Sequence, residues 1–343
     1  MRIFQLNIFL AFLFLGFLFA GGNDKDEEKQ DTNYSPSILS NINNVSISGF
    51  GDIQYSSSNT KNASSVCDVG QLEIDIETIL KNRITVSAAI AYNARDQIFG
   101  VGEFVIDFQI WGIDDDHFKH TDLFDAAGIA IGQFDVPFGI DWHVYPSIER
   151  KLISCPVAVV NTHDGWNDFG VRLYLERKNL NLVLFGVNGY EHQTETFQYS
   201  EKIKMAFGGR FGFKPVEKIE IGGSYAGFVN QSNRINRQLT GADLQVQFEP
   251  IVFKTEYIEQ HFLNFYNLSG YGYYSEIQYD FQYFYLSGRY GYFSNINEQS
   301  KDQRKVSFGG GFNVIEGCEV RCENQFNSFN NFEGTVLQVV VGF

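Results

Sequence analysis

The feature of this chain that most limits its fold is a two-residue alternation of apolar and polar side chains, which recurs from Val45 to the C-terminus. In residues 72–78, Leu, Ile and Ile alternate with Glu, Asp and Glu, and residues 103–110, 243–249 and 273–281 have the same pattern. Successive side chains of a β-strand point to opposite faces, whereas a helix would scatter these carboxylates around its circumference. The alternation therefore predicts strands with one apolar face and one charged face.

Segments of this kind predict about sixteen strands, most of them about 10–13 residues long. Strands in soluble sheets usually have about 5–6 residues, whereas a tilted strand that crosses a bilayer needs about 9–11. The expected strands lie near 45–57, 68–80, 83–94, 102–112, 126–138, 167–177, 180–190, 204–214, 217–229, 238–249, 251–262, 271–281, 283–293, 304–315, 318–326 and 334–343.

The connections between the expected strands alternate between short and long. The short ones are 81–82, 178–179, 215–216, 249–250, 281–282 and 316–317, and the long ones are 58–67, 95–101, 139–166, 191–203, 230–237, 263–270, 294–303 and 327–333. Only the segment 113–125 breaks the alternation. Short periplasmic turns and longer external loops are typical of outer-membrane barrels. The expected fold is all-β: a transmembrane, antiparallel, up-and-down β-barrel.

Residues 1–22 have the features of a cleaved export signal. Arg2 provides a positive charge, residues 8–19 form a mostly apolar run, and residues 20–22 are small. The apolar run is only about a dozen residues, whereas a membrane-spanning helix needs about 20. We therefore expect a signal peptide at 1–22, a polar, acidic periplasmic leader at 23–44 and a barrel at 45–343.

The charge of the chain is strongly acidic. It has 26 Lys and Arg against 41 Asp and Glu, a formal net charge of −15, which argues against nucleic acid as a partner. No cofactor is expected, and the acidic stretch 114–122, with two histidines, is interpreted as a solvated periplasmic turn rather than a metal site. Export permits disulfides. Cys67 and Cys155 both fall in expected external loops, so a disulfide between them and two free thiols are open alternatives.

The charged face of each expected strand lines the lumen if the apolar face meets lipid. A barrel of about sixteen strands encloses an aqueous channel, and charges inside it select ions through the local potential. The inward set is mostly acidic, which predicts a preference for cations. Alternatively, these are hydrated wall residues whose acid–base pairs link neighbouring strands. The expected lumen-wall residues are Glu73, Asp75, Glu77, Glu103, Asp107, Arg172, Glu176, Arg210, Asp243, Glu249 and Arg289.

Residues 139–166 form the longest expected external loop, and loops of this length are usually functional or disordered. The Trp, Tyr, Ile, Val and Pro residues of this loop argue against disorder. We expect the loop to fold into the lumen and narrow it, although its charges could instead simply face water. The candidate constriction residues are Asp141, His143, Glu149, Arg150, Lys151, His163 and Asp164.

The strand that enters this loop ends in the sequence Gly-Gln-Phe-Asp-Val-Pro-Phe-Gly at residues 132–139. A Gly-x-Phe-x-x-Pro-Phe-Gly ending before a long loop resembles the phosphate-selective porin O/P-like family and related outer-membrane porins. The resemblance covers a small fraction of the chain and implies a trimeric diffusion porin with an inward-folded loop. Phosphate is a poor fit as the solute, because acidic residues outnumber basic ones in the expected lumen.

The C-terminus is an alternating apolar stripe of Leu337, Val339 and Val341 that ends on an aromatic residue, Phe343. This ending resembles the last strand of bacterial outer-membrane proteins. The resemblance implies recognition by the barrel-assembly machinery of a Gram-negative bacterium, followed by insertion into outer-membrane lipid.

The expected function is that of a porin without enzymatic activity, which lets small hydrophilic solutes or ions, preferably cations, diffuse through a water-filled lumen. The alternatives are a structural or adhesive barrel with a plugged pore, a phosphate- or anion-selective porin, and a hydrolase with its site at the barrel rim. None of the six histidines lies in a His-x-Ser-Asn-Gly-like context, which argues against the hydrolase.

Overall fold

The computed structural model describes residues 42–59, 65–80, 82–93, 98–112, 124–144, 146–189, 193–194, 197–198, 203–263, 269–295, 302–327 and 331–343. The expected signal peptide, most of the expected leader and the acidic stretch 114–122 lie outside these residues. Within the described ranges, no helix is long and apolar enough to cross a membrane.

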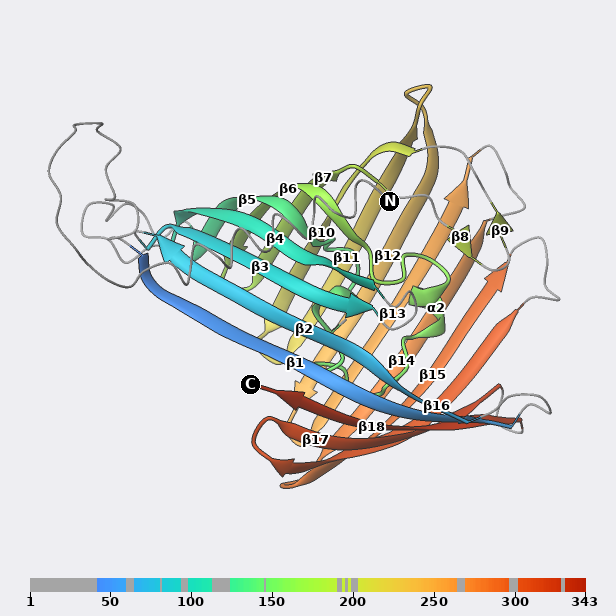
Figure 1. Ribbon diagram of the computed structural model, residues 1–343. Helices are drawn as coiled ribbons and strands as arrows, with labels where there is room; N and C mark the ends of the chain where they lie inside the picture. Colours follow the sequence, from blue (N-terminus) through green and yellow to red (C-terminus); the bar gives the residue numbers. More distant parts are fainter. Residues whose placement is uncertain are drawn as a thin grey trace, which may run out of the picture. The chain divides into compact units, whose positions relative to one another are not determined.

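Sixteen antiparallel strands form one closed barrel, in which each strand pairs with its neighbours in chain order and the last pairs with the first (Figure 1). This confirms the fold predicted from the sequence. The barrel strands are β1 (Ile42–Ser58), β2 (Val66–Leu80), β3 (Ile84–Asn93), β4 (Ile98–Trp111), β5 (Ala126–Asp135), β6 (Asn167–Arg177), β7 (Leu180–Val187), β10 (Ile203–Val216), β11 (Ile219–Asn230), β12 (Ile235–Phe248), β13 (Ile251–Phe262), β14 (Gly270–Asp280), β15 (Phe284–Asn295), β16 (Gln303–Ile315), β17 (Cys318–Phe326) and β18 (Phe332–Gly342).

Most strand ends differ from the expected ones by one to four residues. Strand β1 begins at Ile42, three residues earlier than expected, because residues 42–43 pair with the end of β2. Strand β5 ends at Asp135, because the next residues leave the sheet: the Val136 N–H donates to the Trp166 carbonyl oxygen at 2.8 Å. Two short strands, β8 (Gln193–Thr194) and β9 (Phe197–Gln198), pair with each other inside an expected loop.

Two backbone hydrogen bonds close the barrel beyond the end of β18. The Gly49 N–H donates to the Phe343 carbonyl oxygen at 3.0 Å, and the Phe343 N–H donates to the Gly49 carbonyl oxygen at 2.9 Å. A Cβ at position 49 would lie 2.8 Å from the tip of the Phe343 ring, so glycine makes room for the terminal aromatic side chain. The predicted C-terminal stripe therefore lies on the seam where the barrel closes.

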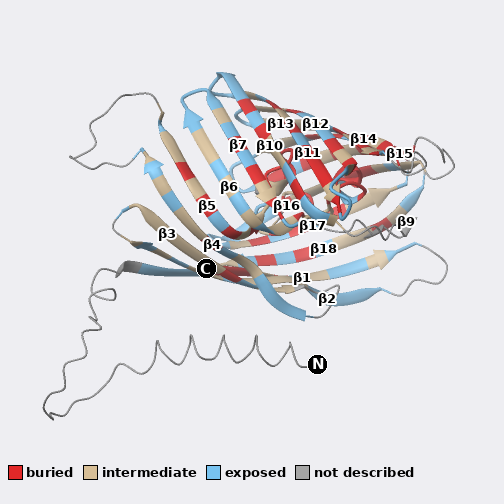
Figure 2. Cartoon of the chain, turned by 90° about the horizontal axis from the view of Figure 1, so that it is seen from above, coloured by how far each residue is buried: buried red, intermediate tan, exposed pale blue. Residues whose placement is uncertain are grey.

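The two faces of the barrel have opposite character. Along β18, Leu337, Val339 and Val341 are exposed on the outer face, whereas the Gln338 and Val340 side chains between them are buried on the inner face. Most of the other strands also expose large apolar side chains on the outside, a pattern that suits contact with lipid. In Figure 2, buried residues are frequent along β10–β15, whereas β2 and β3 have mainly intermediate and exposed residues.

The two ends of the barrel also differ. The turns at 178–179, 217–218, 249–250, 281–283 and 316–317 are short and lie at one end, here called the short-turn end. The longer connections lie at the other, here called the long-loop end. The turn between β10 and β11 is at 217–218 rather than the expected 215–216, because β10 continues to Val216.

Candidate functional site

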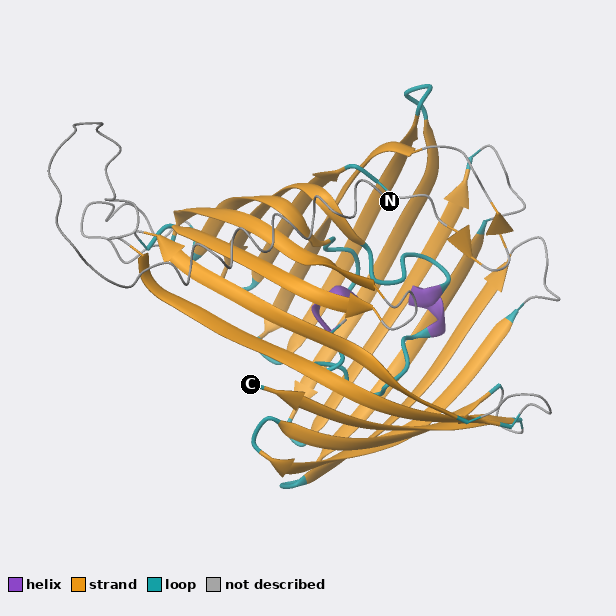
Figure 3. Cartoon of the chain, in the orientation of Figure 1, coloured by secondary structure: helices purple, strands orange, loops and turns teal. Residues whose placement is uncertain are grey.

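The connection between β5 and β6, residues 136–166, folds into the barrel instead of standing outside it (Figure 3). This inward loop contains a 3-10 turn, η2 (Asp141–Val144), and one turn of α-helix, α2 (Val157–Val160). The α2 turn contacts strands β13–β16. The loop therefore occupies one side of the lumen.

Apolar packing fixes the inward loop to the wall. Phe138, Ile140 and Val159 of the loop belong to one buried cluster with Phe228, Leu239 and Ile258 of strands β11–β13. At the end of the loop, the Trp166 ring stacks on Phe228, with the ring centroids 5.0 Å apart. Burial of this many apolar side chains in the lumen explains why the loop does not stay in water.

Gly139 sets the direction in which the chain enters the lumen. Its φ of +67° is a left-handed conformation that other residues adopt only with strain. A Cβ at this position would lie 1.7 Å from the Oε1 atom of Glu256, a side chain that is almost completely buried on β13. The Gly139 N–H donates to the Ser224 hydroxyl oxygen at 2.9 Å. The glycine of the predicted motif is therefore required on both steric and conformational grounds.

Three buried wall arginines hold the backbone of the inward loop. Arg289 on β15 donates to the carbonyl and hydroxyl oxygens of Ser154, both at 2.6 Å. Arg237 on β12 donates to the carbonyl oxygen of Thr162 at 2.5 Å. Arg321 on β17 donates to the carbonyl oxygens of residues 147 and 148. These charge-assisted hydrogen bonds spread the anchoring over the length of the loop.

The lumen arginines are also paired with acids of the same wall. Arg289 lies 3.2 Å from Glu276, and Arg321 lies 2.6 Å from Glu319. Arg210, on β10, lies 2.7 Å from Asp243 and is 2 % exposed. Arg210, Asp243 and Arg289 are on the inner face, as expected for the lumen wall. They are buried in ion pairs between strands, which is the alternative that the sequence left open.

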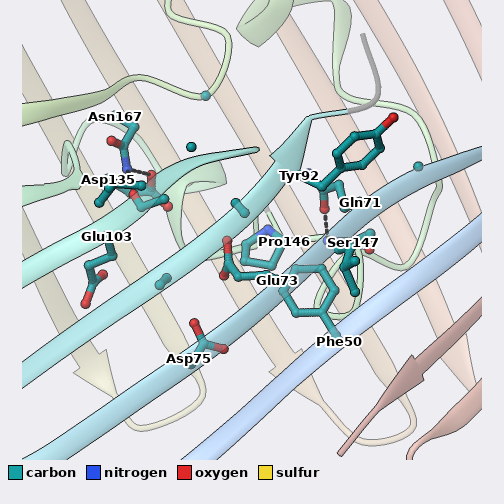
Figure 4. A pocket seen from close by; sticks show the side chains of 18 of the residues that line it. Phe50, Gln71, Glu73, Asp75, Tyr92, Glu103, Asp135, Pro146, Ser147 and Asn167 are labelled. Atoms are coloured by element: carbon teal, nitrogen blue, oxygen red, sulfur yellow. Dashed lines mark hydrogen bonds between the residues drawn. The ribbon is translucent and has the colours of Figure 1, made fainter. Parts of the chain in front are cut away.

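The open part of the lumen lies on the opposite side, between the inward loop and strands β1–β4. It is a cavity of about 1110 Å³ that is bordered by wall and loop residues together (Figure 4). Six carboxylates line it, and five of them are on the wall strands: Glu73, Asp75, Glu77, Glu103 and Asp135, here called the cavity carboxylates.

The cavity carboxylates form no ion pair with any of the described residues. Their hydrogen-bond partners are neutral: the Ser87 hydroxyl donates to Glu103 at 2.5 Å, and the Asn167 amide donates to Asp135 at 2.8 Å. Every ion pair between described residues of the lumen lies elsewhere, on the loop or on strands β10–β18. The lumen wall therefore has two regions. Under the loop, basic and acidic side chains form ion pairs, and facing the cavity, the acidic side chains have no ion-pair partner among the described residues.

The expected constriction residues divide into two groups. Arg150 and Asp164 line the cavity. Asp141 lies behind them, with its carboxylate 3.2 Å from Arg150 and its side chain 2 % exposed. Burial alone would raise the pKa of Asp141, but Arg150 and other nearby cations hold it below its usual value.

The other loop residues lie off the cavity. His163 is packed edge-on against Phe138, with ring centroids 5.0 Å apart, and burial lowers its pKa to about 4. Its placement differs from the expected pore-facing one, because its ring forms part of the contact between loop and wall. Lys151 lies 3.5 Å from Glu319, and Glu149 is exposed. The His143 side chain lies outside the described residues.

The remaining expected wall residues are spread along the barrel. Asp107 accepts a hydrogen bond from the Tyr174 hydroxyl at 2.9 Å, and Arg172 lies over the Phe134 ring. Glu176 is exposed near the short-turn end of β6. Glu249 departs from the expectation: β12 ends at Phe248, so Glu249 lies in an exposed turn and not on the wall.

Sequence reasoning missed several residues that shape the site. Asp135 was part of the motif at residues 132–139. Because it is at the end of a strand, the alternation did not show that its side chain points into the lumen. Gln71 accepts a hydrogen bond from the Ser147 N–H at 2.6 Å and so ties the loop to the acidic wall. The position of Arg237 fits the alternation of its strand. Nothing in the sequence indicates that it contacts Thr162, which is 75 residues earlier in the chain. Only the folded path of the loop reveals these contacts.

The cysteines and possible metal ligands add no further chemistry to the described part of the site. All four cysteines are free, so Cys67 and Cys155 are not joined by a disulfide. Burial raises the pKa of the Cys155 thiol. The described residues contain no group of three or more His, Cys, Asp or Glu side chains that could hold a metal ion.

Comparison with known proteins gives a structural match without a sequence match. No protein-family model and no curated protein matches the chain. A mutant of the Rhodopseudomonas blastica porin superposes with a TM-score of 0.57 at 12% identity, over 87% of this chain and 100% of that one. The chain has the fold of a porin. A structure described as "Asymmetric conductivity of engineered proteins" matches with a TM-score of 0.58 at 13% identity, over 88% of this chain and 100% of that one.

These matches support the porin architecture that the sequence resemblance implied. They do not support its phosphate-selective branch. At such low identity they establish the fold alone, and the solute has to be argued from the side chains of the lumen.

Proposed function

We propose that this protein is an outer-membrane porin through which small hydrophilic solutes and ions diffuse passively, with a preference for cations. The observation that supports this best is the segregation of lumen charge. The cavity carboxylates face open space without an ion-pair partner among the described residues, whereas Arg237, Arg289 and Arg321 are occupied by the loop backbone.

The size of the electrostatic effect is sufficient for selectivity. A monovalent cation about 4 Å from one carboxylate gains about 1 kcal/mol in bulk water and about 4 kcal/mol at an effective dielectric of about 20. An anion loses the same amount. Because the five cavity carboxylates border the same cavity, their summed potential favours cations without forming a tight site.

The setting in the outer membrane rests on the export signal at 1–22 and on the apolar outer face of the barrel. Exposed side chains such as Ile74, Phe211 and Ile277 lie on that face and would be unfavourable in water. Under this proposal the stripe that ends at Phe343 is the signal that the barrel-assembly machinery recognises, and outer-membrane lipid surrounds the folded barrel.

We further propose a homotrimer in which β2 and β3 face another copy. The exposed large apolar side chains on the outer face of these two strands are aliphatic: Val69, Ile74 and Ile90. Strands β13–β16 instead expose Tyr and Phe rings, which are typical of the lipid–water boundary. Mass photometry in detergent should give a trimer, and Ile74→Lys should reduce it to monomers; a monomeric wild-type protein contradicts this assembly.

Planar-bilayer recording with a panel of salts and sugars tests the proposed function. We expect open channels in KCl, a reversal potential of the cation sign in a salt gradient, and passage of small neutral sugars. Absence of conductance from correctly folded protein would favour the plugged structural barrel, and a reversal potential of the anion sign would favour an anion porin. Hydrolysis of membrane lipid by purified protein would favour the rim enzyme.

A further inference from the structure

A row of three tyrosines and one arginine crosses the strands β13–β16 in register. Tyr257 pairs with Tyr273, Tyr273 pairs with Tyr292, and Tyr292 pairs with Arg304. The rings of Tyr273 and Tyr292 have their centroids 5.5 Å apart, and the guanidinium carbon of Arg304 lies 5.7 Å from the Tyr292 centroid. The four side chains, here called the tyrosine–arginine row, thus form one continuous surface.

The tyrosine–arginine row lies on the outer face of the barrel. Its members alternate along the strands with Glu256, Tyr274 and Arg289, which are buried beneath the inward loop. Side chains next to each other on a strand point to opposite faces. Tyr257 and Tyr273 are 41% and 37% exposed, and Arg304 is also exposed.

The row marks a boundary along the outer face. Toward the short-turn end lie the exposed apolar side chains of Ile277, Leu286 and Phe308. Toward the long-loop end lies a polar pair, His261 and Glu259, whose side chains are 2.9 Å apart. A belt of aromatic residues at such a transition lies at the level of lipid headgroups. Arg304 is therefore at the depth where a headgroup phosphate would lie.

The Arg304 guanidinium forms no ion pair with any described residue. The nearby Asp302 uses both carboxylate oxygens to accept hydrogen bonds, from the Tyr292 hydroxyl at 2.8 Å and from the Ser294 hydroxyl at 2.7 Å. These bonds fix the Tyr292 ring beneath Arg304. An arginine held over an aromatic ring presents its N–H groups in a planar fork that matches a phosphate.

We propose that the tyrosine–arginine row binds the phosphorylated sugar headgroup of a glycolipid in the leaflet at the long-loop end. Arg304 holds the phosphate, and the faces of Tyr273 and Tyr292 pack against the C–H faces of the sugar rings. The acyl chains then continue along the apolar surface toward the short-turn end. This inference rests on the proposed outer-membrane location and not on the selectivity of the pore.

Native mass spectrometry of the mature, detergent-solubilised protein with added bisphosphorylated lipid A tests the proposal. We expect Arg304→Gln to weaken lipid binding about tenfold, equivalent to the loss of one charge-assisted contact. Tyr292→Leu, which keeps the surface apolar, should also weaken it. The matched control is Lys305→Gln: this neighbouring cation points into the lumen, where it lies 3.4 Å from Glu333, so its loss should leave binding unchanged.

Three outcomes would overturn the proposal. Equal lipid binding by wild type and Arg304→Gln would show that Arg304 does not hold the phosphate. Equal weakening by Lys305→Gln indicates a general effect of net charge. Equally tight and equally Arg304-dependent binding of phosphatidylglycerol assigns the site to any lipid phosphate rather than to a glycolipid. We expect Arg304→Gln to leave ion selectivity unchanged. The lipid proposal is therefore tested by lipid binding and the pore proposal by ion selectivity, and each can fail without the other.

Discussion

Arg289 donates two hydrogen bonds of 2.6 Å to Ser154, one to the carbonyl oxygen and one to the hydroxyl. The contact joins the barrel wall to the middle of the inward loop. It also explains how a lumen with several arginines can keep an acidic cavity wall, because Arg237, Arg289 and Arg321 donate to the loop backbone instead of facing the cavity.

Removing this contact should release the loop. Arg289→Gln removes the charged donor of both hydrogen bonds to Ser154, and a hydrogen bond to a charged group typically contributes about 1.5–3 kcal/mol. Glu276 keeps its second cation, Lys254, at 3.4 Å. We expect larger oligosaccharides to enter liposomes that contain the variant, measured by liposome swelling. Lys305→Gln removes a lumen cation that is paired with Glu333 instead, and it should leave the size limit unchanged. An unaltered size limit in Arg289→Gln would show that the loop is held without this arginine.

A second test concerns the entry of the loop. Gly139→Ala forces an L-residue into φ +67°, which costs about 1–2 kcal/mol, and it places a methyl group against Glu256. We expect the loop to swing out far enough for trypsin to cut after Arg150 or Lys151. Gly186→Ala, where a Cβ meets nothing within 4 Å, is the control and should stay resistant. Resistance of both variants would contradict the steric role of Gly139.

Acid should loosen the loop through His163. The pKa of His163 is about 4 when the loop is packed, below the ordinary value of 6.5. Between these two pH values the imidazole is protonated when the loop is displaced and neutral when the loop is packed. The packed form is therefore at full stability above about pH 6.5 and loses about 1.4 kcal/mol per pH unit as the pH falls toward 4. Asp141, whose pKa is lowered, contributes a loss only below 3.8.

The corresponding measurement is hydrogen–deuterium exchange of the loop amides at several values between about pH 7 and pH 4.5, corrected for the intrinsic exchange rate and compared between wild type and His163→Gln. We expect protection of the wild-type loop to fall across this range and that of His163→Gln to stay nearly constant. Identical pH dependence of both proteins would assign the effect to other groups.

The terminal aromatic residue should act in assembly rather than in transport. Its ring lies over Gly49 at the seam, and its side chain is 69% exposed on the outside of the barrel. Phe343→Ser should lower the amount of folded barrel in membranes, measured by heat-modifiable migration, while the channels that form keep the wild-type conductance. Phe332→Ser, at the other end of β18, is the control. A changed conductance would place Phe343 in the transport path.

Much of this fold could be predicted from the sequence, because strand alternation is a local property. The bounds of β6, β13 and β17 agree with the expected ones, since charged and apolar residues alternate there up to the turn. The end of β5 was placed three residues late, because Val136 and Phe138 continue the apolar pattern although they already belong to the loop.

The candidate site was less predictable, because it depends on which wall the loop covers. Alternation places Arg289 and Glu73 alike on the inner face. It does not show that Arg289 meets Ser154 while Glu73 meets open space. Glu249 was misplaced for a local reason: it follows the last paired residue of β12, and alternation alone does not mark where pairing stops.

The central claim, that the cavity carboxylates beside the loop make the pore cation-selective, is tested most directly by the reversal potential in a tenfold KCl gradient. An ideal cation channel gives about 59 mV, and we predict a potential of this sign for wild type. Joint replacement of the cavity carboxylates by their amides should move the potential toward zero, whereas joint replacement of the exposed turn acids Glu217, Glu249 and Glu316 should not. A wild-type potential of the anion sign, or one that the cavity replacements leave unchanged, would contradict the account.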